Sequence, residues 1–326
     1  MDIINKRHKP TKSNVYDTYW KFASKRQDIF FNRIAGNPFP WTDDKILIDY
    51  KFTNVYRSSD RVSQFLINNV IYKGDQSPEE VLFRIMIYKM FNRISTWEAI
   101  EKHVGEVSYR NYSFKEYDYA IMNQMSNKIP VYSQAYMMTG SNPSFTHQKK
   151  HRNHLDIVKN MVDEGVADIL AECDNFENVN TILFSYPSIG EFLAYQFATD
   201  INYSNIIDFD EMSFVKAGPG ARDGINKCFD DYGDYSFEDI IMMMADIQEK
   251  EFERLGLEFK TLFGRRMQLI DCQNVFCEVD KYSRVAHPES LGYSKRIKIK
   301  QKYSFQSNEK PELFFPPKWN INHLIP

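Results

Sequence analysis

Hydrophobic residues recur every three or four positions along most of the chain, which is the spacing that places them on one face of an α-helix. Residues 15–34 show the pattern first, with aromatic side chains on one face and Lys and Arg on the other. Pro38 and Pro40 follow and predict the end of this helix, because proline removes a backbone donor and blocks helical geometry. The same spacing returns in residues 57–72 and 151–173. The pattern predicts a mostly α-helical protein.

Two helix starts can be placed from their capping residues. Ser77 precedes Pro78 and two glutamates, so the serine caps the helix, the proline opens it and the acids complement its dipole. Ser236 is followed three positions later by Asp239, which is the capping-box pattern. Residues 293–305 instead alternate basic with apolar or aromatic positions, which predicts a strand, a hairpin or a basic arm.

Composition narrows the class of protein. The 326 residues include 25 Phe and 20 Tyr but only 13 Gly and 13 Pro, which favours a large packed core over disorder. A net charge of -3 neither requires nor excludes a nucleic-acid partner, since local patches decide. The four cysteines lack metal-site spacing and predict buried free thiols. No apolar run approaches the roughly 20 residues of a membrane span, and the N-terminus lacks a signal core, so we expect a cytoplasmic protein without a membrane partner.

Cofactor motifs give a negative result. Neither a Walker A pattern nor a G-x-G-x-x-G fingerprint occurs in the sequence, so a self-contained nucleotide site is not expected. His147, His151 and His154 are clustered, but neighbouring cations oppose a metal ion there. We therefore expect neither a metal nor another cofactor.

A proline–glycine turn at residues 187–190 is the first candidate site. It separates two apolar stretches and predicts a helical hairpin whose second helix begins at Glu191. The turn resembles that of helix–hairpin–helix DNA glycosylases, and it exposes backbone N–H groups that can hold a DNA phosphate beside Gly190. Phe192 stands where strand-cleaving members carry a Schiff-base lysine, so the resemblance implies no lyase. An ordinary turn between two helices is the alternative.

Three acids after this turn are the candidate catalytic carboxylates. In the glycosylase fold an acid follows the turn at a distance that Asp208 and Asp210 fit, while Asp200 comes earlier. A carboxylate there can stabilise a cationic centre or activate a nucleophile. Solvated loop acids are the alternative for all three.

A second glycine-rich turn lies at residues 217–225. Gly218 and Gly220 permit close approach of the backbone to a phosphate, and Arg222 adds positive charge beside them. A structural loop that only needs unusual dihedral angles is the alternative.

Four stretches in this order, residues 51–72, 186–204, 217–225 and 271–285, carry a more specific resemblance. Together they resemble the alpha-glutamyl/putrescinyl thymine pyrophosphorylase superfamily, which includes the helical domain of 5-hydroxymethyluracil DNA kinases and the phage amino-acid:DNA transferases. The resemblance implies an all-α, glycosylase-like domain over residues 1–290, of one or two lobes. Residues 291–326 would then be a basic extension of irregular or β structure.

The resemblance also implies a chemistry. In phage members a pyrophosphorylated 5-hydroxymethyluracil in DNA loses pyrophosphate and gains an amine from an amino acid or a polyamine. Kinase members join this domain to a P-loop, which these 326 residues do not contain, so kinase activity is not expected of them. The expected partners are double-stranded DNA with a modified thymine and an amine co-substrate, in a bacterial cell or a phage-infected host.

Residues in the matched stretches suggest where substrate binds. Arg57 and Arg61 flank Asp60 and would share one helical face, where they can clamp phosphate or pyrophosphate. The stretch 271–285 would form a polar helix face that lines the substrate, and a flipped base needs such edge hydrogen bonds and an aromatic ring. Surface ion pairs and a solvated helix face are the respective alternatives. The candidates within residues 271–285 are Asp271, Gln273, Asn274, Tyr282 and Arg284 for binding, and Glu278 and Lys281 for catalysis.

Basic segments can supply the electrostatic part of DNA binding. Residues 147–154 and 295–302 are the larger ones, and Tyr293, Tyr303 and Phe305 near the second can stack on bases. Three hypotheses follow from the whole sequence. The first is an enzyme that flips a modified thymine and replaces its pyrophosphate with an amine; the second is a DNA glycosylase; the third is a DNA-binding module without catalysis.

Overall fold

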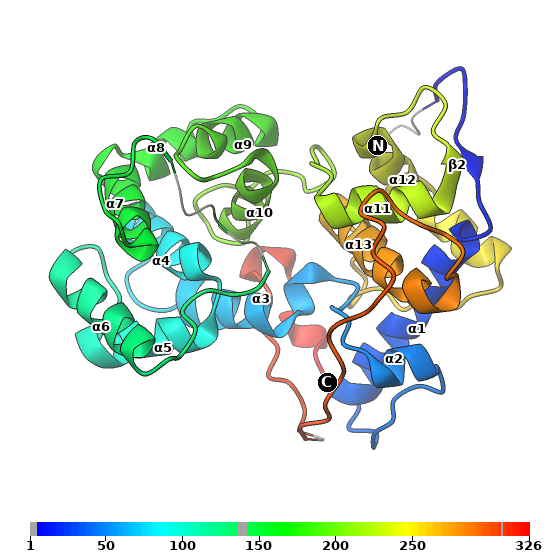
Figure 1. The fold of residues 1–326 in the computed structure, drawn as a ribbon, viewed down its shortest axis with the longest axis horizontal. Coiled ribbons are helices and arrows are strands. Elements are labelled where there is room, and N and C mark those ends of the chain that lie inside the picture. Colours follow the sequence, from blue (N-terminus) through cyan, green and yellow to red (C-terminus); the bar gives the residue numbers. More distant parts are fainter. Residues whose placement is uncertain (1–4, 136–137, 139–141, 308) are drawn as a thin grey trace. The chain divides into compact units, whose positions relative to one another are not determined.

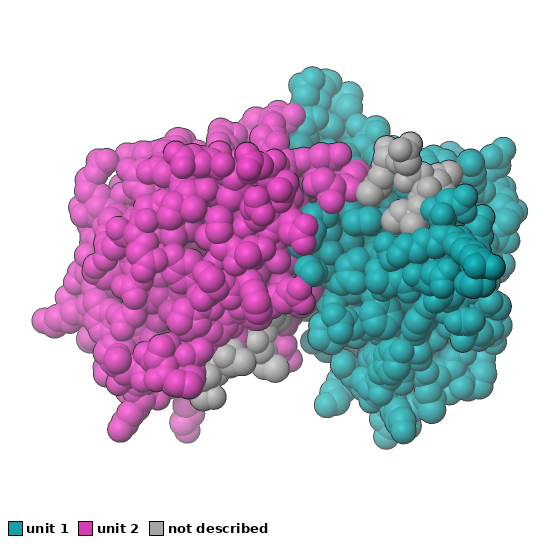
Figure 2. Space-filling view, turned by 90° about the horizontal axis from the view of Figure 1, so that it is seen from above, with its two compact units in different colours: residues 1–60, 214–313, 319–326 teal, residues 61–213, 314–318 magenta. Residues whose placement is uncertain are grey.

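The computed structural model describes residues 5–135, 138, 142–307 and 309–326. These residues form α-helices α1–α13, short 3₁₀ and π helices and one two-stranded antiparallel sheet, so the all-α class is confirmed (Figure 1). They divide into two compact units, coloured separately in Figure 2. Unit 1 comprises residues 1–60, 214–313 and 319–326, and unit 2 comprises residues 61–213 and 314–318. The expected domain boundary at residue 290 stays a prediction.

Unit 1 is built around α13, which packs against α1, α11 and α12. Its core is aromatic: the Tyr19 and Phe276 rings lie 4.5 Å apart between α1 and α13, and both side chains are buried. The helix predicted from residues 15–34 and the capping box at Ser236 are confirmed. The elements of unit 1 are β1 (Thr11–Lys12), α1 (Tyr16–Ile34), α2 (Lys45–Asp49), η1 (Arg57–Ser59), α11 (Pro219–Cys228), β2 (Phe229–Asp231), α12 (Phe237–Arg254), α13 (Leu269–Ala286) and η4 (Asn322–Leu324).

Helices α11 and α13 pack closely because glycines face the contact. A Cβ atom on Gly224 would lie 2.0 Å from the backbone oxygen of Phe276, and one on Gly220 would lie 2.2 Å from the sulfur of Cys277. Real Cβ atoms do not approach other atoms so closely, so the glycines are explained by helix packing inside unit 1. The sequence had suggested phosphate contact for Gly220, and that role stays a prediction.

We expect Gly224→Ala to lower the free energy of unfolding by about 1–3 kcal/mol, because the added methyl group must push α11 away from a backbone oxygen that cannot rotate aside. Arg222→Ala on the exposed side of the same helix is the control and should cost less than about 1 kcal/mol. Urea denaturation of both variants measures the difference. Equal stability of the two variants would contradict this packing role.

Unit 2 is a cluster of helices in which α4 contacts α7, α8 and α10. The helix start predicted at Pro78 is confirmed, with Ser77 at the cap position. One predicted helix is wrong: Gly165, at φ 69°, separates α7 from α8, so residues 151–173 are not continuous. The elements of unit 2 are α3 (Arg61–Phe65), the π-helix η2 (Leu66–Ile71), α4 (Pro78–Phe91), α5 (Ile94–Val104), α6 (Phe114–Ser126), α7 (Lys150–Asp163), α8 (Val166–Ala171), α9 (Phe176–Phe184) and α10 (Glu191–Ile201).

The expected helix over residues 57–72 is also interrupted. Asp60 has an extended backbone, with ψ 146°, and it ends η1 just before α3 begins at Arg61. Arg57 and Arg61 therefore do not share one continuous helical face, which corrects the prediction made from their spacing.

Of the alternatives expected for residues 293–305, the strand and the hairpin are wrong, and the structure of the extension is irregular. Residues 293–305 contain only an isolated bridge, between Tyr50 and Lys302. The one sheet of the described residues pairs β1 with β2 instead. In the described ranges no helix has both the length and the apolar character needed to cross a membrane.

Candidate functional site

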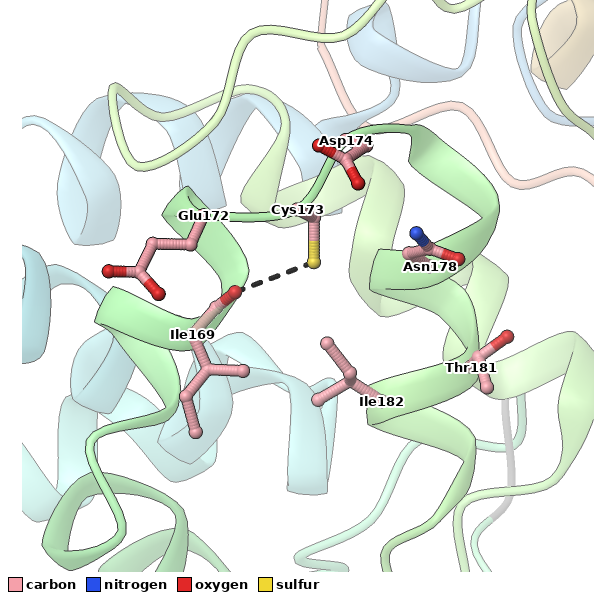
Figure 3. Close-up of a pocket in the computed structure, with 7 residues that line it drawn as sticks. All are labelled: Ile169, Glu172, Cys173, Asp174, Asn178, Thr181 and Ile182. Carbon is pink, nitrogen blue, oxygen red and sulfur yellow. Dashed lines mark hydrogen bonds between the residues drawn. The ribbon is translucent and has the colours of Figure 1, made fainter.

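A pocket in unit 2 lies between α8 and α9 and contains none of the candidate residues (Figure 3). Cys173 is the thiol among its lining residues, and its sulfur donates a hydrogen bond to the Ile169 carbonyl at 3.4 Å. Burial raises the pKa of the Cys173 thiol, which disfavours the reactive thiolate. The pocket therefore offers no evident chemistry.

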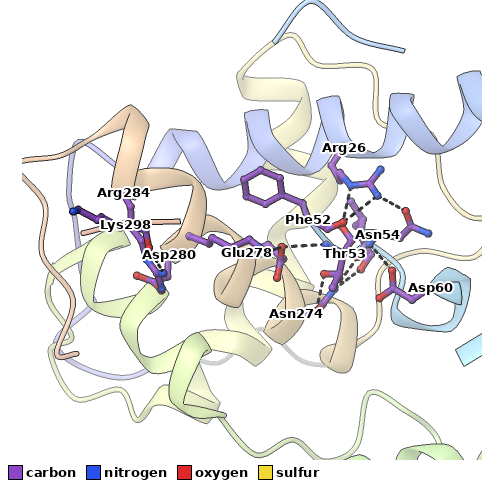
Figure 4. Close-up of polar contacts among 12 residues, drawn as sticks. Arg26, Phe52, Thr53, Asn54, Asp60, Asn274, Glu278, Asp280, Arg284 and Lys298 are labelled. Carbon is purple, nitrogen blue, oxygen red and sulfur yellow. Dashed lines mark hydrogen bonds and ion pairs between the residues drawn. The ribbon is translucent and has the colours of Figure 1, made fainter. Parts of the chain in front are cut away.

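The polar face of α13 holds an irregular stretch of backbone, the Phe52–Asp60 segment, which includes η1 (Figure 4). Asp271, Asn274 and Glu278 lie three and four positions apart on the helix, so they face the same side. Each satisfies backbone groups that no helix or sheet partner satisfies. The bonds run from Thr53 N to Glu278 Oε2 at 3.1 Å, from Asn274 Nδ2 to the Asn54 carbonyl at 2.8 Å, and from Arg57 N to Asp271 Oδ1 at 2.9 Å.

Arg26 of α1 holds the same segment from the other side. Its Nε donates to the Thr53 carbonyl at 2.9 Å and its Nη2 donates to Asn54 Oδ1 at 2.6 Å. Burial lowers the pKa of Arg26, and the negative charges of Asp60 and Glu278 act against this shift. The segment is thus fixed between two helices by charged and amide side chains.

Asp60 ends this segment and carries an unusual carboxyl group. It is half-buried, and its Oδ1 accepts a hydrogen bond from Asn54 N at 2.8 Å. Burial raises the pKa of Asp60 to about 7, while the Asn54 hydrogen bond and the Arg26 charge oppose the rise and Glu278 adds to it. A carboxyl group with this pKa can accept or donate a proton near neutral pH.

The rest of the α13 face makes contacts within the protein. The Lys281 ammonium lies 2.6 Å from Glu278 and 4.6 Å from the centre of the Phe52 ring, and the Tyr282 hydroxyl donates to Asp44 at 2.8 Å. Gln273 is buried. Arg284 binds Asp280 at 2.5 Å and the Lys298 carbonyl at 3.2 Å. These contacts give the face a scaffolding role, and direct contact between the face and a substrate stays a prediction.

The three acids after the turn lie in unit 2 in different environments. Asp200 is fully buried in α10 and its carboxylate lies 2.9 Å from the Lys89 ammonium, which is also buried. Asp208 is exposed and pairs with Lys318 at 3.1 Å, and exposed Asp210 caps the backbone N–H of Met212 at 2.8 Å. Burial suits Asp200 to a structural ion pair more than to proton transfer with a substrate.

The two turns have the helix starts predicted for them. Gly190 occupies the cap position of α10, and Gly218 that of α11. Arg222 donates from Nε to the Ala217 carbonyl at 3.1 Å, and its guanidinium lies 5.5 Å from the Phe237 ring. Exposed Arg61 opens α3. Phosphate binding by these residues stays a prediction.

Sequence reasoning missed Arg26 and Asn54. Arg26 lies in a helix rich in Lys and Arg, where nothing local separates it from solvated neighbours. Its role depends on contacts across 27 or 28 positions in the chain, to Thr53 and Asn54. Such long-range partners leave no periodic signal.

These features define a class: a mostly helical protein in which two helices fix an irregular segment that ends in a carboxyl group of raised pKa. The helical domain of 5-hmdU DNA kinases matches residues 13–292, so the chain belongs to that family. A 5-hmdU DNA kinase of Bacillus phage SP10 is 28% identical over 330 residues, which cover 94% of this chain and 51% of that protein. The chain thus spans about half the length of this relative. No solved structure is significantly similar.

Proposed function

We propose that the chain is an enzyme of DNA thymine modification that acts on a derivative of 5-hydroxymethyluracil within DNA. Membership of the 5-hmdU DNA kinase helical-domain family and the phage relative support the substrate class. The observation that carries an enzymatic role is Asp60, whose carboxyl has a pKa of about 7 at the end of a firmly held segment. Perturbed carboxyl groups of this kind are concentrated at functional sites.

The proposed reaction is displacement of pyrophosphate by an amine. The nitrogen lone pair of the amine attacks the methylene carbon attached to C5 of the base, and a new C–N bond forms. The bond between that carbon and the pyrophosphate oxygen breaks, and pyrophosphate leaves with the electron pair. The proton released by the nitrogen passes to the Asp60 carboxylate, which a pKa near neutrality suits to the task.

Other residues support this step. Asp271, Asn274 and Glu278 act as positioning residues because they fix the backbone that leads to Asp60. Arg57 is proposed to attract the pyrophosphate, and its backbone position is set by Asp271. The proposal replaces Asp200, Asp208 and Asp210 with Asp60 as the base. Phosphoryl transfer from ATP is not proposed, since the 326 residues lack a Walker A sequence.

Mass spectrometry of digested nucleosides tests the proposal. Duplexes carrying thymine, 5-hydroxymethyluracil or its pyrophosphorylated form are incubated with the protein, amino acids and polyamines. We expect a heavier nucleoside that appears only from the pyrophosphorylated duplex and identifies the amine. Free base with an abasic strand would establish a glycosylase instead. Unchanged nucleosides with measurable DNA binding would favour a module without catalysis.

A further inference from the structure

A group of aromatic rings gathers on unit 1 away from its core. The Phe39 ring stacks on Tyr303 with centroids 5.8 Å apart and an angle of 21°, and it lies 5.0 Å from Phe305 at 35°. Trp41 packs edge-on against Phe39 at 5.4 Å. Phe305 is 42% exposed, and Phe39 and Tyr303 are partly exposed. Near-parallel rings at the surface offer flat faces for further stacking.

The segment that carries two of these rings is fixed to the protein. Lys51 N donates to the Gln301 carbonyl at 3.1 Å, and Tyr303 N donates to the Asp49 carbonyl at 2.9 Å. These two bonds flank the bridge between Tyr50 and Lys302. Residues 298–305 are therefore an ordered edge of unit 1 and not a loose basic arm.

This edge is positively charged. Lys298, Lys300 and Lys302 are exposed, and residues 298–305 include no acid. The Lys302 ammonium lies 4.0 Å from the centre of the Tyr50 ring, and the Arg33 guanidinium lies 5.6 Å from the Trp41 ring. Two exposed acids, Asp43 and Asp49, lie in the neighbouring segment of the same chain. Lysines interleaved with stacking rings suit a polymer of phosphates and flat bases.

We propose that this aromatic edge, formed by Phe39, Trp41, Lys298, Lys300, Lys302, Tyr303 and Phe305, binds unpaired nucleotides of a DNA strand. The bases would stack on the exposed rings, and the lysines would neutralise the phosphates between them. Duplex DNA fits this surface less well, because paired bases do not present their faces. The inference rests on the proposed action on DNA and adds a strand-binding surface to it.

The position of the edge agrees with the proposed chemistry. Lys51, which pairs with Gln301, immediately precedes the Phe52–Asp60 segment. The backbone of Lys51 thus joins the aromatic edge to the start of the segment that ends at Asp60. A strand opened around the modified base has such unpaired neighbours.

Fluorescence anisotropy with a labelled, unmodified oligothymidine tests the proposal on the full chain. Replacing Tyr303 and Phe305 together with Ala should weaken binding about 10-fold or more, because stacking on both bases is lost. Tyr119→Ala removes an aromatic side chain that is 59% exposed in unit 2, and it should leave the Kd unchanged. Replacing Lys298, Lys300 and Lys302 with Gln should reduce the salt dependence by about two in log–log slope.

The remaining results either support or overturn the aromatic edge. Tyr303→Phe with Phe305→Tyr should restore binding, and thermal unfolding should show that all variants are folded. Unchanged affinity in the double Ala variant, or no binding of oligothymidine by the native chain, would overturn the aromatic edge. Because the probe contains no modified base, this failure is separate from failure of the nucleoside assay. If the native chain is active in the nucleoside assay but the double Ala variant binds oligothymidine as tightly as the native chain, only the aromatic edge is rejected.

Discussion

Replacing Asp200 with Ala is expected to lower the free energy of unfolding by about 3–5 kcal/mol, the cost typical of removing one partner of a buried ion pair. The Lys89 ammonium would stay buried 2.9 Å from where the carboxylate had been, while its hydrogen bond to Asn92 at 2.9 Å reaches a neutral oxygen. An uncompensated charge in a low-dielectric interior is strongly unfavourable. The effect concerns folding and not catalysis.

Urea denaturation followed by circular dichroism measures this loss. Asp208→Ala is the matched control, since that side chain is 82% exposed and its pair with Lys318 lies at the surface. The control should change the stability by no more than about 0.5 kcal/mol. A stable Asp200→Ala variant that binds DNA and is inactive would contradict the structural assignment and return Asp200 to the list of catalytic acids.

Replacing Asp60 with Asn is expected to slow amine transfer by about 10²–10⁴-fold, the usual contribution of a general base. The Asn side chain can still accept the hydrogen bond from Asn54 N but cannot take up a proton. In the native protein the rate should rise as pH passes through about 7, because the carboxyl ionises there. This rise should be absent from the variant when single-turnover rates between pH 5.5 and 8.5 are compared at equal concentrations of unprotonated amine.

The same substitution has a stability signature of known sign. The folded-state pKa of Asp60 lies above its unfolded value of about 4, so folding favours the protonated form. That stabilisation is complete below pH 4 and is lost as pH rises through about 7. Relative to the native protein, Asp60→Asn should therefore gain melting temperature between pH 5 and pH 8. Exposed Asp43→Asn is the control; an identical pH profile in both variants would contradict the raised pKa.

Helix positions were predictable where capping residues and hydrophobic spacing agree. Pro78 after Ser77 and the box from Ser236 to Asp239 each mark a true helix start. The interruptions were harder to predict. Asn92 ends α4 with φ 48°, a left-handed conformation that is unusual outside glycine, and Asp60 is extended within an otherwise helical pattern. Tertiary contacts select these conformations, so the local sequence does not reveal them.

The sequence indicated the helix face of the candidate site but not the backbone segment that this face binds. The polar spacing of Asp271, Asn274 and Glu278 correctly indicated a special face of α13, because polar residues at helical steps meet one surface. The partner of that face is the backbone of the Phe52–Asp60 segment, more than 200 positions away. A backbone carries no residue-type signal for such pairing. The sequence therefore predicted the polar face of the helix but not the backbone segment that it binds, and contact of this face with substrate stays a prediction.

Counting pyrophosphate against product gives the most direct test of the proposed chemistry. A duplex with one pyrophosphorylated 5-hydroxymethyluracil is incubated with the chain and the amine identified by the nucleoside assay. Released pyrophosphate and modified nucleoside are then measured in the same sample. The proposed displacement predicts one pyrophosphate for each C–N bond formed, with both products greatly slowed in Asp60→Asn. Pyrophosphate release without a new nucleoside, or a new nucleoside formed equally well by Asp60→Asn, would contradict it.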